Sequence, residues 1–98
     1  MIDSLRVTHD PAGSRFQYAS GGQTAELTYR LRGDRMILLH TGVPAEMEGG
    51  GVGGQLVTAA VEHAAREGLT IVPACPFASS WLDRHPDVAA LVPLDAPR

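Results

Sequence analysis

Five glycines in six residues, from Gly49 to Gly54, mark the point where the hydrophobic pattern of this 98-residue chain changes its period. Before the cluster, apolar and polar residues alternate, as from Ala25 to Leu31, which is typical of half-buried β-strands. After it, apolar residues recur every three or four positions, which is typical of an amphipathic helix. A chain that changes once from strands to helices is expected to adopt an α+β fold.

Three strands are expected in the first half, at 14–19, 25–31 and 36–43. The short turns between them predict antiparallel hairpins. The run from Met36 to Leu39 is apolar on successive residues, which predicts a strand covered on both faces. The segment from Leu5 to Thr8 is expected to add an edge strand.

In the second half, a helix is expected from Val52 to its end at Gly68. A short strand at 69–72 follows, then a helix near 77–85 and a last turn capped by Asp87. The order is therefore β-β-β-α-β-α. The strand–helix–strand crossover predicts that strand 69–72 lies parallel to the strand before the glycine cluster. We expect one minimal sandwich domain over residues 1–98, with its sheet covered by helices.

Composition excludes several classes of protein. All eight basic residues are arginines and they are scattered, so nucleic-acid binding is not expected; Arg30, Arg32 and Arg35 are interpreted as a solvated sheet face. No apolar run approaches the roughly 20 residues of a membrane helix, and no signal peptide is recognised, so a cytoplasmic protein without membrane contact is expected. One cysteine and four widely separated histidines predict neither a disulfide nor a metal site.

The glycine cluster joins an apolar strand to a helix, where glycines let a ligand approach the backbone closely. The amides at the start of such a helix form an anion site, which favours phosphate binding over a plain turn. Gly49, Gly51 and Gly54 match the dinucleotide pattern G-x-G-x-x-G, but the antiparallel strands before them do not suit it. A P-loop is excluded because Gln55-Leu56 stands where lysine and a hydroxyl residue are needed.

Three motifs occur in order along the chain: His40-Thr41-Gly42-Val43-Pro44, then Glu48-Gly49-Gly50-Gly51-Val52-Gly53, then Pro73-Ala74-Cys75-Pro76-Phe77 with His85-Pro86. Together they resemble the small single-domain branch of the GNAT acetyltransferase superfamily, over Phe16 to Val92. Two positions depart from that branch, which usually has Glu at position 42 and a basic or amidic residue at position 50.

The resemblance implies acetyl-CoA as the cofactor, with its pyrophosphate on the amides of residues 51–54 and its pantetheine arm along the strand ending at 41–43. An exposed strand edge suits the amides of that arm. The implied cofactor-binding residues are Thr41, Val43, Glu48, Gly49, Gly50, Gly51, Val52, Gly53 and Gly54.

Cys75 and His40 are the candidate catalytic residues. Cys75 resembles the family's cysteine and would accept the acetyl group as thiolate or protonate the departing sulfur as thiol; the alternative is a small buried hydrophobe. His40 would act as a base, or else be hydrogen-bonded in the core. His63 is expected to be solvated, His85 to close a helix, and Trp81 to pack the last helix on the sheet.

The function expected is that of an acetyl-CoA-dependent N-acetyltransferase acting on a small-molecule or protein amine. The alternative is a non-catalytic module that binds CoA or acyl-CoA, or contacts a partner protein. A monomer or weak dimer is expected.

Overall fold

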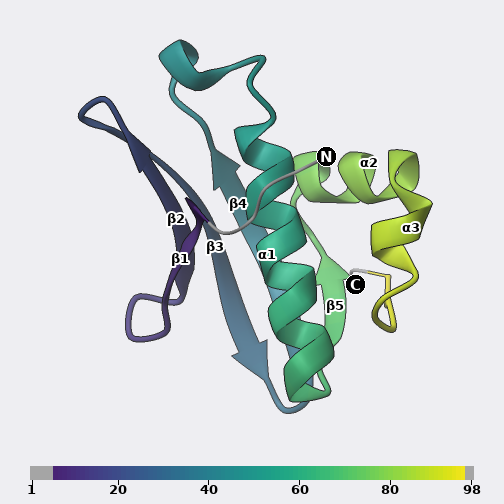
Figure 1. The fold of residues 1–98 in the computed structure, drawn as a ribbon. Helices are drawn as coiled ribbons and strands as arrows, with labels where there is room; N and C mark the ends of the chain where they lie inside the picture. The colour runs from purple at the N-terminus through teal and green to yellow at the C-terminus, as the bar shows by residue number, and fades with distance from the viewer. Residues whose placement is uncertain (1–5, 97–98) are drawn as a thin grey trace.

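The computed structural model describes residues 6–96, which form one five-stranded sheet with helices packed against it (Figure 1). The strands are β1 Thr8–Asp10, β2 Arg15–Ser20, β3 Gln23–Arg32, β4 Arg35–Gly42 and β5 Thr70–Pro73. The helices are the 3-10 turn η2 Ala45–Met47, then α1 Val52–Glu67, α2 Pro76–Arg84 and α3 Pro86–Ala89. The α+β fold class is confirmed. An edge strand is present, but at Thr8–Asp10, so only Thr8 of the predicted segment belongs to it; Arg6 and Val7 precede the strand, and Leu5 is outside the described residues.

Strand order in the sheet follows the chain, β1-β2-β3-β4-β5. The turns that join β2 to β3 and β3 to β4 have glycines at positive φ, with Gly21 at 58° and Gly22 at 79° in the first. Two consecutive residues of that kind form the turn whose twist matches an antiparallel hairpin. β5 pairs in parallel with β4, as the crossover through α1 predicts.

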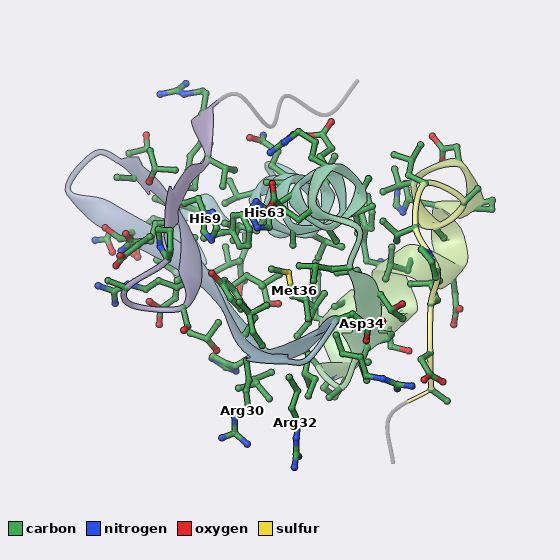
Figure 2. All side chains as sticks on the ribbon, turned by 90° about the horizontal axis from the view of Figure 1, so that it is seen from below. His9, Arg30, Arg32, Asp34, Met36 and His63 are labelled. Atoms are coloured by element: carbon green, nitrogen blue, oxygen red, sulfur yellow. The ribbon has the colours of Figure 1, made fainter. Side chains whose placement is uncertain are left out.

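One face of the sheet carries the core. Ala25, Leu27 and Tyr29 alternate with more exposed residues along β3, and α1 packs over them (Figure 1). Arg30 and Arg32 point away from α1 on the other side (Figure 2). The expectation of a strand covered on both faces is wrong for β4, because Leu39 is 43% exposed. Helices α2 and α3 lie beside α1 at the β5 edge (Figure 1).

A one-residue bulge at Leu39 changes which side chains of β4 face the core. Tyr29 pairs with Leu38, whereas the preceding residue of β3, Thr28, pairs with His40, so Leu39 is the extra residue. Directly paired residues share a face of a sheet. Leu38 therefore faces the core beside Tyr29, and His40 lies on the open face beside Thr28.

The ends of the helices agree in part with the sequence. Gly68 follows α1 with φ of 70° and ends it, as predicted. The helix expected near Phe77 begins at Pro76, and His85 ends it. The prediction that Asp87 caps the last turn is wrong: α3 begins at Pro86, and Asp87 lies within its first turn without a capping hydrogen bond. Within residues 6–96, no helix is long and apolar enough to cross a membrane.

A cluster of aromatic rings attaches β1 to α1. His9 stacks on Phe16 with ring centroids 4.2 Å apart, and its Nε2 lies 2.6 Å from the Tyr29 hydroxyl. His63 of α1 meets the His9 ring edge-on at 4.5 Å, and both histidines are labelled in Figure 2. His63 is half-buried here, so the expectation that it is solvated is wrong.

Burial lowers the pKa of His9 below its usual value of 6.5, and the nearby His63 and Arg66 lower it further, while Asp10 opposes them. At pH values above 6.5 the imidazole of His9 is neutral, and its burial in that form contributes to the stability of the fold. This contribution is lost as pH falls through the folded-state pKa, because protonation then favours the unfolded chain.

We predict that acidification from about pH 8 to about pH 5 lowers the free energy of unfolding more in the wild type than in His9→Gln. Glutamine keeps a partner for the Tyr29 hydroxyl but has no proton to gain. The measurement is urea unfolding at each pH, with the exposed His40→Gln as the matched control. An equal pH dependence in wild type and His9→Gln would contradict the prediction.

Candidate functional site

A pocket of about 460 Å³ lies between the end of β4, the glycine loop and the first turns of α1 and α2. Eight of the nine residues predicted to bind the cofactor line it, and Gly50 does not. The remaining walls come from Met47, Phe77 and Trp81. The lining residues that the sequence predicted are Thr41, Val43, Glu48, Gly49, Gly51, Val52, Gly53 and Gly54.

The start of α1 provides unpaired backbone donors at this pocket. The first bond of the helix runs from the Gln55 N–H to the Gly51 carbonyl at 3.0 Å, so the amides of residues 51–54 precede the intrahelical ladder. No side chain caps this end of the 16-residue helix, and its first turn carries no acidic residue. The partial positive charge of the helix terminus is therefore not offset from within the helix, and these residues fit an anionic group.

Four of the five glycines are required by the structure, in two pairs and for two different reasons. Gly49 and Gly51 have φ of 86° and 78°, which strongly favours glycine at both positions. Gly53 and Gly54 are needed for packing instead. A Cβ on Gly53 would lie 2.6 Å from the Phe77 ring, and one on Gly54 would lie 2.5 Å from Nε1 of Trp81. Helix α2 therefore packs directly on the backbone at the start of α1.

The wall from α2 was missed by the sequence analysis, which assigned Trp81 to packing on the sheet. Trp81 is 5% exposed, stacks on His85 at 3.8 Å and also lines the pocket. The His85 ring is held by its Nδ1, which lies 2.8 Å from the Trp81 carbonyl oxygen. The sequence signal for this wall was the pair Gly53-Gly54 inside α1, because glycine weakens a helix and its presence there usually has a packing or functional reason.

Cys75 lies behind the pocket wall. It is 3% exposed, and its Sγ lies 3.4 Å from Oγ1 of Thr41, which does line the pocket. The Cys75 N–H donates to the Leu38 carbonyl at 2.9 Å, which extends the contact between β4 and the segment after β5. Cys75 therefore does not line the pocket itself but contacts Thr41, which does.

His40 is exposed and lies on the open face of the sheet. The alternative of a histidine hydrogen-bonded in the core is therefore wrong. A Cβ added to Gly42 would lie 3.3 Å from Nε2 of His40, so these two residues share that face. Thr41 and Val43 line the pocket, whereas His40 does not. The structure does not bring the two predicted catalytic residues together on one side.

These features define an α+β protein with a pocket at the amino terminus of its first long helix. The sequence profile of the GCN5-related N-acetyl-transferase family matches residues 15–91. The chain is also similar to a GCN5-like candidate N-acetyltransferase of Staphylococcus aureus, known from its NMR solution structure, with 28% identity and a TM-score of 0.73. That match covers 97% of this chain and 92% of the other. The chain belongs to the GCN5-related N-acetyltransferase family, as its motifs predicted.

We predict that Gly54→Ala lowers the free energy of unfolding by about 1–2 kcal/mol, because the overpacking cost exceeds the helix propensity gained. The new methyl group would meet the buried Trp81 ring. Gly50→Ala is the matched control, since its Cβ would lie 3.4 Å from the Met47 carbonyl oxygen and its φ is not positive. Urea unfolding midpoints compare the two, and equal stability of both variants would contradict the packing role of Gly54.

Proposed function

We propose that this protein is an acetyl-CoA-dependent N-acetyltransferase that acts on a small-molecule or protein amine. The observation that carries the proposal is the pocket at the uncapped start of α1, lined by eight residues that the family resemblance assigned to the cofactor. When bound, the cofactor supplies an activated acetyl group as a thioester. The protein's contribution is to hold that group and orient it.

The backbone amides of residues 51–54 are proposed to bind the pyrophosphate. The end of β4 suits the pantetheine arm for a separate reason. β5 pairs with β4 only as far as Leu38, so none of the described strands pairs with the edge of residues 40–42 that faces away from β3. Such an edge can pair with the amides of an extended ligand.

The pocket lining offers a negative charge and no positive one among the described residues, which limits how it could bind phosphate. Among residues 6–96, Glu48 is the only charged residue that lines the pocket, and it is exposed. Phosphate binding would therefore depend on neutral backbone donors and the helix dipole, against a nearby carboxylate. An added negative charge in this loop is therefore expected to weaken phosphate binding markedly.

His40 is proposed as a base only for an acceptor that reaches the sheet from its open face. Its ring lies beside Gly42, where the absence of a side chain leaves the imidazole uncovered on that side. Cys75 is proposed to assist the transfer from behind Thr41.

We predict that Gly49→Asp binds coenzyme A about tenfold more weakly than Gly49→Asn, a difference of about 1.4 kcal/mol. Both side chains tolerate the positive φ of this position and have nearly the same shape, so charge alone separates them. The measurement is isothermal titration with coenzyme A and acetyl-CoA, repeated at high salt, where the difference should shrink.

Equal affinity of the aspartate and asparagine variants would contradict phosphate binding at this loop. Absence of saturable binding by the wild type at millimolar concentration would overturn the proposed function altogether.

The second candidate is a binding module that holds CoA or acyl-CoA without turnover. The observation in its favour is that Glu48 is the one titratable side chain in the pocket lining that the described part of the chain provides. Release of free CoA thiol from acetyl-CoA against a broad amine panel separates the two functions. Saturable binding without any amine-dependent release would favour the module.

A further inference from the structure

Between the pocket and Cys75 stands the hydroxyl of Thr41. Thr41 lines the pocket, whereas Cys75 is 3% exposed and is absent from the lining. A hydrogen bond joins the thiol to the pocket wall, with Sγ of Cys75 3.4 Å from Oγ1 of Thr41. A ligand in the pocket therefore meets the threonine hydroxyl before it can meet the thiol.

Both partners of this contact are fixed by backbone pairing. Thr41 pairs with the buried Leu27 of β3, and the bulge at Leu39 is what turns it to the pocket side. The Cys75 N–H donates to the Leu38 carbonyl, and the Cys75 carbonyl accepts the Ser79 N–H at 3.0 Å at the start of α2. The hydroxyl and the thiol are thus held by β4 and by the β5–α2 junction.

The direction of the hydrogen bond between Thr41 and Cys75 decides whether the Thr41 hydroxyl is free to donate to a ligand. A thiol can donate or accept a hydrogen bond, and so can a hydroxyl. With the Cys75 thiol as donor, the Thr41 oxygen is the acceptor and the single hydroxyl proton is left to donate into the pocket. The thiol then orients a neutral donor toward the ligand without touching it.

We propose, on the basis of the proposed function, that Thr41 is the catalytic hydrogen-bond donor of the pocket and that Cys75 is a positioning residue for it. Acyl transfer from a thioester joins the amine nitrogen to the carbonyl carbon, breaks the bond from that carbon to sulfur, and moves one proton from nitrogen to sulfur. Negative charge develops on the carbonyl oxygen and on the departing sulfur. A preorganised hydroxyl donor stabilises that charge, and Thr41 keeps its own proton at the end.

Steady-state kinetics of four variants test these roles. Thr41→Val keeps the shape of the side chain without the hydroxyl and is expected to lower kcat about 100-fold. Thr41→Ser restores the donor and should recover most of that loss. Cys75→Ser keeps a hydrogen-bond partner and should lower kcat by less than tenfold. Thr24→Val, an exposed threonine of β3, is the matched control and should leave kcat unchanged.

Measurement of the Kd for coenzyme A separates an effect of Thr41→Val on catalysis from an effect on the structure of the pocket. The Kd for coenzyme A should be the same in Thr41→Val and wild type, because the hydroxyl acts on the developing charge. Unimpaired turnover in Thr41→Val with loss in Cys75→Ser would overturn the proposal and make the thiol the reacting group. Wild-type binding of coenzyme A without turnover would also overturn it, whereas absence of binding would overturn the proposed function itself.

Alkylation of Cys75 by iodoacetamide gives a readout that needs no turnover. The wild type should react slowly until urea unfolds it, since the thiol is buried behind Thr41. Thr41→Val should stay slow, and Thr41→Ala should react at least about tenfold faster because it removes the shielding methyl and hydroxyl groups. Rapid wild-type alkylation that coenzyme A blocks would mean that the thiol itself faces the pocket, and would overturn the arrangement.

Discussion

The close approach of α1 and α2 at their first turns determines the shape of the pocket. The rings of Phe77 and Trp81 reach the backbone of Gly53 and Gly54, which have no side chain in the way. Trp81 also belongs to the hydrophobic core, so this wall is fixed by the same packing that holds the sheet and helices together. A terminus held by core packing keeps its unpaired amides in one arrangement, and an anion site gains affinity from donors that need no reordering.

The glycine cluster therefore meets two separate requirements within a few residues. Gly49 and Gly51 give the chain the positive φ needed to turn from the loop into the helix, and Gly53 and Gly54 give α2 room to pack. A ligand-binding interpretation alone would assign all of them to close approach by phosphate. In the structure, the unpaired amides at the start of α1 and the surface on which α2 packs are adjacent parts of one helix turn, so a change that affects one will tend to affect the other.

Local pattern predicted much of this molecule. The hairpins, the helix that ends at Gly68 and the parallel pairing of β5 follow from period, glycine placement and crossover geometry. The loop side of the pocket and the family followed from the motifs. What could not be predicted depends on contacts between distant segments: the contact of His63 with His9 requires β1 to lie against α1, and the bulge at Leu39 is defined only by its pairing with β3.

The bulge decides which face of the sheet each side chain of β4 occupies after Leu38. With the bulge at Leu39, Thr41 stands at the pocket wall and the His40 imidazole lies on the open face. If β4 kept Leu39 but paired with β3 without the bulge, simple alternation from Leu38 would move the imidazole to the pocket side and Thr41 to the open face, while every residue kept its identity. Two strands of equal length, one with the bulge and one without it, would thus present different chemistry at the same backbone site, and a comparison by sequence position alone would not detect the difference.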